Sequence, residues 1–419
     1  MNSEAKGSLD VLLPRGLLGS GLDVLDAPIT SEGLIAVRLE WDKARINQIK
    51  PISPSSNSDL KLLLPRLVEP HAHIDKAFTW QKFPNFTGTY EEALRVNLKE
   101  HKSRTEEDVT ERAEKALRLS LKNGLRAIRS HIDSFGMNAY QIWETLADIK
   151  NNWEEFIRLE FVALVPLEYW GTDEGQLLAI KIASQGGLLG GVIVPPFDKK
   201  QTRASIRQML ILANKLGCAV DIHIDEAQNY PAAGLRELIN VLDEMKLDVP
   251  ITCSHSSSMS LLNKRDLIAI SERLASHKVH VVALPLTNSW LLGRYPHKTL
   301  LKRPLAPIYQ LQRAGITVSV GGDNVQDAWY PSGNFDPLAL MAFAMPFAHL
   351  APWERLGLTP FTTAPANMMG LEWDGIIELG SPADFILLNV TSWIEALSSP
   401  PSRDIIINGQ WLRKNHLPK

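Results

Sequence analysis

The sequence predicts a (β/α)₈ barrel (TIM barrel) with a small β-sandwich domain built from both chain termini. Eight short apolar runs alternate with longer helical stretches, which is typical of repeated βα units around a parallel sheet. Short β-like pieces lie before and after this region, at residues 34–41 and 375–389. No G-x-G-x-x-G segment follows the first run, which disfavours a doubly wound sheet. We expect residues 1–65 and 366–419 to form the β-sandwich and residues 66–365 to form the barrel.

The eight apolar runs are the predicted barrel strands. They cover residues 62–68, 125–133, 158–166, 188–194, 217–225, 249–255, 280–285 and 315–323. Thr89 and Glu92 form a capping box that predicts the start of one helix. Thr105 and Asp108 predict the start of the next in the same way. Further helices are expected over residues 202–216, 235–245, 260–275 and 336–345. The last of them should stop or kink at Pro346.

The bulk composition is that of an ordinary globular protein. Of the 419 residues, 45% are hydrophobic and 22% are charged. The net charge of −3 gives no electrostatic reason to expect a nucleic-acid or membrane partner. The first residues lack the pattern of a signal peptide, and Cys218 and Cys253 read as free thiols in a reducing compartment. We therefore expect a cytoplasmic protein with a small-molecule substrate, and a homo-oligomer is compatible with the sequence.

Polar side chains collect at the ends of the predicted strands. Side chains two residues apart on a strand point the same way, so His71 and His73 aim two imidazoles at one spot. Active sites of barrel enzymes lie at the C-terminal ends of the strands. The residues there are His71, His73, His131, Asp133, His223, Asp225, Glu226, His255 and Asp323. Three neutral imidazoles and one carboxylate suit Zn²⁺ or Fe²⁺, so the sequence predicts a metal site.

The strand ends favour one set of ligands and two further roles. We expect His71, His73, His223 and Asp323 to bind the metal, although strand position alone leaves open which histidine stays off it. His255 would orient or deprotonate the water that the metal activates. Glu226 could carry protons between that water and a leaving nitrogen. The alternative is a surface glutamate that opens a loop.

Five segments together resemble the cytosine-deaminase-like branch of the amidohydrolase superfamily. They are "PHAHIDKAF", "HIDE", "SHSSSM", "PLTNSWLLGRYP" and "GGDNVQDAWYP", and "GSPADFILLN" is similar to the closing β segment of that superfamily. The resemblance covers essentially the whole chain. It implies that His71, His73, His223 and Asp323 hold a single Zn²⁺ or Fe²⁺. It also implies that Glu226 is the proton shuttle and that His255 and Asp323 assist the attacking water.

The fourth predicted strand carries no lysine. Binuclear members of the superfamily bridge two metals with a carboxylated lysine at that strand, whereas Lys199 and Lys200 come here only after it has ended. The resemblance therefore implies one metal ion rather than two.

Two departures from the family pattern concern substrate binding. Leu167 stands where the family has a glutamine that reads cytosine, and leucine cannot make those paired hydrogen bonds. Glu168 or Trp170 could replace it. Asn324 stands where true cytosine deaminases carry a second aspartate. Both changes weaken cytosine as the substrate.

Four further candidates for the pocket stay open. Trp329 packs over the substrate ring or belongs to the core. Lys76 reaches an anionic or carbonyl group or forms a surface salt bridge. His131 and Asp133 line the pocket or form structural hydrogen bonds.

The predicted reaction is hydrolytic deamination. A mononuclear metal-dependent hydrolase would replace the amino group of a cytosine-like pyrimidine, purine or triazine with oxygen and release ammonia. One alternative is an amidohydrolase that releases an alkylamine from a triazine or opens a cyclic amide. The other is a catalytically silent barrel that only binds a ligand.

Overall fold

The computed structural model describes residues 5–20, 28–53, 59–136, 138–295 and 297–413. The chain divides into two compact units. Unit 1 consists of Met1–Val68, Leu119–Arg126 and Asp336–Lys419, and unit 2 of Glu69–Arg118 and Ala127–Phe335.

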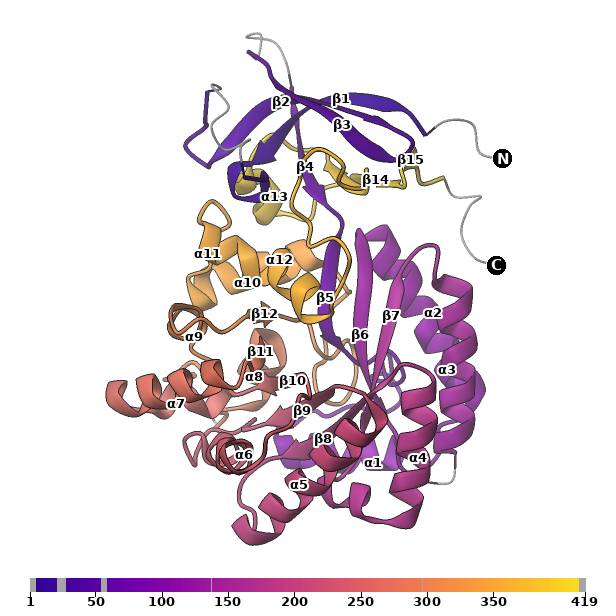
Figure 1. Ribbon diagram of the computed structural model, residues 1–419, viewed down its shortest axis with the longest axis vertical. Helices are drawn as coiled ribbons and strands as arrows, with labels where there is room; N and C mark the ends of the chain where they lie inside the picture. Colours follow the sequence, from indigo (N-terminus) through magenta and orange to yellow (C-terminus); the bar gives the residue numbers. More distant parts are fainter. Residues whose placement is uncertain (1–4, 21–27, 54–58, 137, 296, 414–419) are drawn as a thin grey trace. The chain divides into compact units, whose positions relative to one another are not determined.

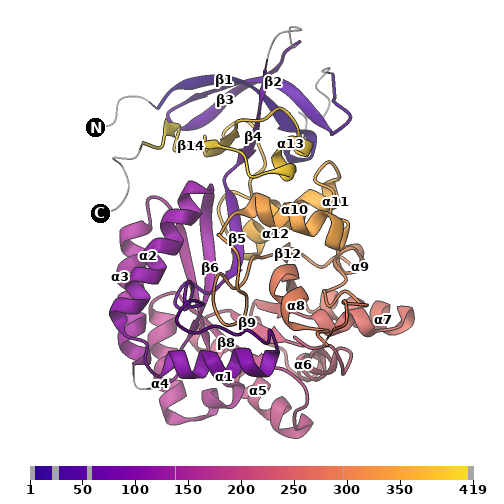
Figure 2. The same cartoon turned by 180° about the vertical axis from the view of Figure 1, so that it is seen from behind.

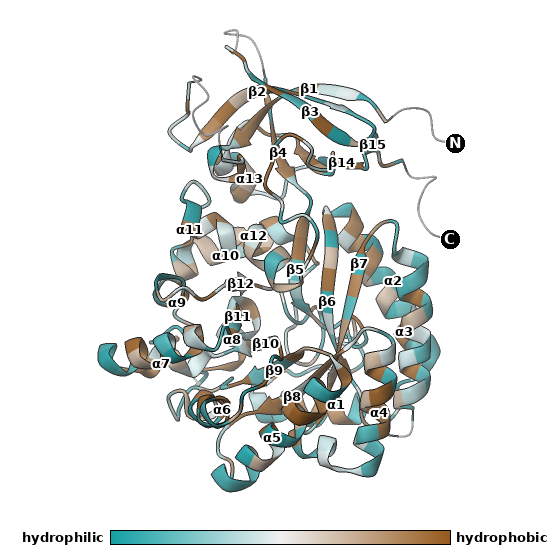
Figure 3. Ribbon diagram, in the orientation of Figure 1, coloured by the Kyte–Doolittle hydropathy of each residue, from teal (hydrophilic) through white to brown (hydrophobic). Residues whose placement is uncertain are grey.

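The predicted fold is confirmed by an eight-stranded parallel sheet that curls into a nearly closed barrel (Figure 1). Its strands, in spatial order, are β5 (Leu67–Ala72), β6 (Leu125–Asp133), β7 (Arg158–Leu164), β8 (Leu188–Ile193), β9 (Val220–Ile224), β10 (Ile251–His255), β11 (His280–Ala283) and β12 (Val318–Val320). The backbone N–H of Asp323 donates to the carbonyl of His71 at 2.9 Å, so the segment after the last strand meets the first. Strand β8 is largely brown in Figure 3, as expected for a strand covered on both faces.

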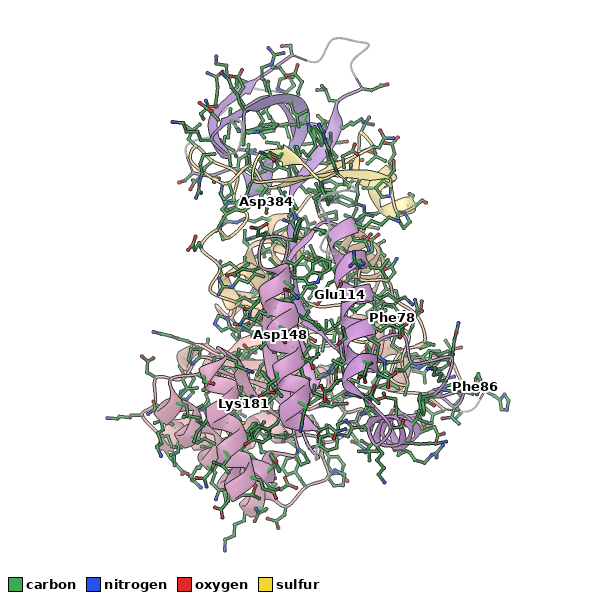
Figure 4. All side chains as sticks on the ribbon, turned by 90° about the vertical axis from the view of Figure 1, so that its right-hand side faces the viewer. Phe78, Phe86, Glu114, Asp148, Lys181 and Asp384 are labelled. Atoms are coloured by element: carbon green, nitrogen blue, oxygen red, sulfur yellow. The ribbon has the colours of Figure 1, made fainter. Side chains whose placement is uncertain are left out.

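Helices follow the strands of unit 2 along the chain. Their bounds are α1 (Tyr90–His101), α2 (Glu106–Lys122), α3 (Ala139–Trp153), α4 (Asp173–Ser184), α5 (Lys199–Leu216), α6 (Ala233–Glu244), α7 (Lys264–Ser276), α8 (Pro285–Leu291) and α9 (Ile308–Arg313). Figure 4 shows α2, α3 and α4 side by side, marked by Glu114, Asp148 and Lys181. The indole of Trp153 on α3 donates to Glu114 on α2 at 2.8 Å, which ties these two helices together.

The two helix starts predicted from capping boxes agree with the structure. The Thr89 hydroxyl accepts from the Glu92 N–H at 3.3 Å. Thr105 and Asp108 form the full reciprocal capping box. Helix α7 begins later than predicted, at Lys264, because a short 3₁₀ turn over Ser257–Leu261 precedes it.

Unit 1 contains a seven-stranded mixed sheet to which both ends of the chain contribute. Its order is β15 (Gln410–Trp411), β14 (Arg403–Ile407), β13 (Phe385–Leu388), β4 (Lys61–Pro65), β1 (Gly7–Pro14), β2 (Leu34–Asp42) and β3 (Arg45–Pro51). Its buried core includes Trp41, Phe385 and Leu13. Unit 1 also holds α10 (Pro337–Ala348), α11 (Arg355–Leu358), α12 (Thr363–Met368) and α13 (Trp393–Ser398). Pro346 lies inside the last turn of α10, which continues to Ala348.

The first predicted barrel strand is two strands in the structure. Strand β4 pairs with β13 in the mixed sheet, and β5 belongs to the barrel. The change of partner occurs at Arg66, whose buried guanidinium contacts Asp384 and the carbonyl of Leu125. A single apolar run concealed this change, because both strands are buried and give the same pattern.

Within the described residues, every helix is too short or too polar to cross a membrane.

Candidate active site

Five buried histidines meet at the C-terminal ends of the barrel strands. The ring of His71 on β5 lies at the centre of the group. Its centroid is 3.8 Å from that of His131, 4.7 Å from His223, 5.3 Å from His73 and 5.6 Å from His255. The strand ends thus bring together side chains that are far apart in the sequence.

Among the described residues, three overlapping groups of histidines and aspartates have the spacing of metal ligands. They are His71, His73 and Asp323; His71, His223 and His255; and His71, His131 and Asp221. Within each group the potential ligand atoms lie within 4.8 Å of one another. The four predicted ligands fall in the first two groups, which share His71.

Several ligand atoms in this cluster have no hydrogen-bond partner among the described residues. They are His71 Nε2, His223 Nδ1, His255 Nε2 and both carboxylate oxygens of Asp323. The Asp323 Oδ1 atom lies 3.2 Å from His73 Nε2 and 3.5 Å from His71 Nε2. Buried polar atoms without partners are costly, so the unpartnered Nε2 of His71 and the Asp323 carboxylate fit a bound cation that would satisfy them.

The charge states of the cluster also fit a metal. Burial lowers the pKa of His71 and His223 well below the usual value, so both imidazoles are neutral and can act as ligands. Burial alone would raise the pKa of Asp323, but the close ring of His73 and the nearby His255 outweigh it, so the pKa falls. The cluster therefore offers neutral nitrogens and one carboxylate.

A chain of hydrogen bonds fixes the ring of His71 from behind. Its Nδ1 lies 2.9 Å from the Ser254 hydroxyl, which donates to Asp221 at 2.8 Å. Arg129 donates to the other oxygen of Asp221 at 2.9 Å. The Nδ1 of His73 is bonded to a backbone carbonyl in the same way, at 3.0 Å. Both rings thus turn Nε2 into the cluster, as metal-binding histidines do.

Glu69 on β5 connects the first strand of the barrel to the loop that carries Asp323. Its carboxylate accepts from the backbone N–H of His71 at 3.0 Å and from that of Gly322 at 3.1 Å. A Cβ atom on Gly321 would lie 2.9 Å from this carboxylate, so the double glycine makes room for it. Sequence reasoning missed Glu69, although its place two residues before His71 and the Gly-Gly pair before Asp323 are visible signals.

The backbone turns sharply at three of the strand ends. Asp225, His255 and Asp323 have φ angles of 56°, 70° and 62°, a region that non-glycine residues rarely occupy and that is often found at functional sites. The Asp225 carboxylate accepts from the N–H groups of Gly234 and Leu235 at 2.8 and 2.9 Å, which caps the start of α6. These two bonds hold the turn after which Glu226 enters the cavity.

Glu226 is buried and contacts a residue that sequence reasoning did not select. The Asn288 amide, on α8, donates to Glu226 Oε1 at 3.2 Å and to His255 Nδ1 at 3.0 Å. Burial, together with Asp323, raises the pKa of Glu226 well above its usual value. Burial lowers the pKa of His255 to about 4. Asn288 belongs to "PLTNSWLLGRYP", one of the segments that resemble the family, but its contacts depend on how α8 follows β11, which the sequence does not show.

Lys76 is buried and forms an ion pair. Its Nζ lies 3.2 Å from Asp133 and 5.8 Å from the ring centroid of Trp329. Burial disfavours the ammonium, but Asp133 and neighbouring carboxylates outweigh it, so the pKa of Lys76 is raised. Asp133 also accepts from Asn97 at 3.2 Å and from Arg104 at 3.0 Å. The surface salt bridge considered above is therefore wrong for Lys76, since the pair lies inside the protein.

One cavity of about 470 Å³ is lined by His73, His223, Glu226, His255 and Asp323. Its lining includes His73, Lys76, Tyr90, Leu94, Asn97, Leu98, Asp133, Phe135, Leu164, Leu167, Glu168, Val192, Val194, His223, Glu226, His255, Asp323, Asn324 and Trp329. This size and the mainly apolar walls with a few converging polar groups are typical of small-molecule sites.

All five predicted substrate-binding residues line this cavity: Lys76, Leu167, Glu168, Asn324 and Trp329. Asn324 donates to Asp327 at 2.7 Å, and Trp329 packs edge-on against Tyr90 with 5.1 Å between ring centroids. The indole of Trp170 instead donates to the carbonyl of Gly190 at 2.8 Å, and Trp170 does not appear in the lining.

The family model for the "Amidohydrolase family" matches residues 85–411. This chain belongs to the amidohydrolase family. The prediction of a hydrolase that acts on carbon–nitrogen bonds is confirmed.

Two relatives cover nearly the whole chain. The chain is 27% identical to a pterin deaminase from Rhizobium rhizogenes, over 90% of this chain and 88% of the relative. It is 23% identical to N-isopropylammelide isopropyl amidohydrolase from a Pseudomonas species, over 97% and 98%. Among solved structures, 5-methylcytosine deaminase from Klebsiella pneumoniae, liganded with phosphonocytosine, has the same fold with a TM-score of 0.80 and 22% identity, over 98% and 99%.

Proposed function

We propose that this amidohydrolase is a mononuclear metal-dependent deaminase that removes an amino group from an N-heterocycle and releases ammonia. The observation that carries the proposal is Glu226, a buried carboxyl group with a raised pKa that shares one cavity with a cluster of unpartnered ligand atoms. A pterin deaminase and a 5-methylcytosine deaminase among the similar proteins support the same reaction.

His71, His73, His223 and Asp323 would hold one divalent ion, Zn²⁺ or Fe²⁺. A divalent ion there supplies a Lewis acid that makes water a nucleophile at neutral pH. The unpartnered atoms of this set support the assignment. Strand β8 carries no lysine, and Lys199, the first residue of α5, is exposed and does not line the cavity, which supports a site for one ion.

Glu226 would hold and move the proton. Because Asn288 donates to its Oε1, the second oxygen is left to carry a proton toward a ring nitrogen and later toward the departing amine. His255 accepts from Asn288 through Nδ1, so the neutral ring carries its proton on Nε2. His255 would thus orient the attacking water as a donor rather than act as the base.

The test is an ammonia-release screen of metal-reconstituted protein. The panel includes cytosine, isocytosine, isoguanine, creatinine, aminotriazines and a pterin. We expect ammonia from at least one ring, about one equivalent of metal, and a loss of roughly 100-fold or more in Glu226→Gln. No ammonia from any ring, or an unaffected Glu226→Gln, would refute the proposal.

Alkylamine release from a triazine is the second candidate, favoured by the N-isopropylammelide relative. An N-alkylated aminotriazine in the same screen distinguishes the two, because the product is then an alkylamine instead of ammonia. A catalytically silent barrel would bind ligands without either product. A cytoplasmic location and a homo-oligomer remain predictions.

A further inference from the structure

Helix α1 presents an apolar stripe toward the cavity. Tyr90, Leu94 and Leu98 are spaced four residues apart and lie on one face of the helix. All three line the cavity that contains Glu226. Leu94 and Leu98 remain 43% and 39% exposed, which is unusual for leucines inside a concave site. Figure 2 shows α1 in front of β8.

The helix is fixed at both ends, so the stripe is held in place. Near its start, Ala93 packs with Leu291 and Leu292, and Tyr90 packs against Trp329. Toward its end, the Asn97 amide donates to Asp133 at 3.2 Å. His101 Nε2 is bonded to the carbonyl of Phe135 at 2.8 Å, and the two rings are 4.1 Å apart. The exposed leucines are thus a rigid wall.

Strands β7 and β8 also contribute apolar residues to the cavity wall. Val192 on β8 lines the same cavity and is 36% exposed. Leu164 and Leu167 at the end of β7 extend this surface. A substrate that fills only the catalytic end would leave Leu94, Leu98 and Val192 in water, whereas a larger one would bury them.

The lining disfavours a phosphorylated substrate. Among the described residues of the cavity wall, Lys76 is the sole lysine or arginine, and Asp133 pairs with it. A phosphate group entering the cavity would find no unpaired cation.

We propose that the substrate is a fused bicyclic amino-heterocycle in its free-base form, an aminopteridine or aminopurine. Its aminated ring meets Glu226, and its second ring lies between the Leu94–Leu98 face of α1 and Val192. The proposal rests on the proposed deaminase reaction, which concerns the first ring. It adds that the apolar wall formed by Leu94, Leu98 and Val192 selects substrates with a second ring.

The test compares isocytosine with the two fused compounds that contain the same aminated ring, pterin and guanine. We expect kcat/KM to be at least about tenfold higher for one fused compound than for isocytosine. The two fused arms distinguish pteridine from purine, and guanosine monophosphate should be no substrate.

Variants show whether α1 causes the preference. Leu94→Ala and Leu98→Ala should each lower kcat/KM for the fused compound about tenfold, and for isocytosine less than about twofold. Leu177→Ala is the matched control, because Leu177 is a 61% exposed helical leucine outside the cavity. Metal content and melting temperature should be the same in all variants. Equal losses on both substrates, or a preference for isocytosine, would overturn the proposal.

Binding measurements separate this proposal from the proposed reaction. If no ring releases ammonia, calorimetric titration of metal-loaded Glu226→Gln with the same compounds still tests the cavity. Tighter binding of a fused compound that weakens in Leu94→Ala would support the inference although the deaminase reaction had failed. Binding without that preference would refute it.

Discussion

The two ends of the cavity differ in how their side chains are held. At the catalytic end, three polar groups have a second contact that fixes them: Ser254 behind His71, a backbone carbonyl behind His73, and Asn288 beside Glu226. At the other end, Leu94, Leu98 and Val192 project into open space from a fixed backbone.

This difference separates chemistry from substrate choice. A catalytic group must be held to a fraction of an ångström, so its supporting contacts are part of its function. An apolar wall needs only the right shape, and an exposed leucine can change without a cavity forming in the core. We therefore expect substitutions at the first end to affect every substrate and those at the second to affect only some.

The largest effect is expected at the metal cluster itself. Asp323→Ala removes the only carboxylate of the predicted ligand set. It should lower metal content and activity on all substrates. The loss should exceed roughly 100-fold, the upper value for removing a residue that only hydrogen-bonds a metal ligand. Metal analysis and ammonia release measure both. Asp148→Ala on the outer face of α3 is the control (Figure 4). Full metal content in Asp323→Ala would remove Asp323 from the ligand set.

The next effect should come from behind His71. Ser254→Ala removes the hydroxyl that fixes the His71 ring and leaves Asp221 without one donor. We expect metal affinity to fall roughly 10- to 100-fold. Competition with a chelator measures the affinity. Ser184→Ala, an exposed serine on α4, should change nothing. Unchanged affinity in Ser254→Ala would mean that the ring is held by packing alone.

The cluster could be predicted from the sequence because it depends on two simple rules, the spacing of residues on one strand and the position of strand ends in a barrel. His71 and His73 share a face of one strand, and the barrel rule brings His223, His255 and Asp323 to the same rim. The contacts behind the cluster could not be predicted. Ser254 reaches His71 from a strand 183 residues later in the chain, through a side-chain geometry that no spacing rule encodes.

The apolar wall was missed for a different reason. A stripe of residues spaced four apart on a helix normally indicates packing against a core. The same pattern in α1 instead lines a cavity, and only the placement of the helix reveals this. Leu167 was identified because the resemblance supplied an expected residue at that position.

A smaller effect is expected at Asn288, which supports Glu226 and His255 but does not belong to the predicted ligand set. Asn288→Ala should lower kcat on all substrates by roughly 10- to 100-fold, because it removes the hydrogen bond to Glu226, the proposed proton carrier. Metal content should stay at the wild-type value. Steady-state kinetics with metal analysis measures both. Loss of metal in this variant would show that Asn288 supports the ligands rather than the proton shuttle.

The smallest effect should come from Leu167, which lines the cavity just after the end of β7. Its side chain is buried against Gly191, where a Cβ atom would lie 2.9 Å from Leu167 Cδ1, so glycine makes room for the leucine. Leu167→Gln adds an amide of similar length that can bond the polar edge of a pyrimidine. It should raise the ratio of kcat/KM for cytosine over a fused substrate by about tenfold, with metal content unchanged. Leu167→Met keeps an apolar side chain of similar volume and should leave the ratio unchanged. The same shift in Leu167→Met would mean that Leu167 acts through shape, and that the polar edge of the substrate is read elsewhere in the cavity.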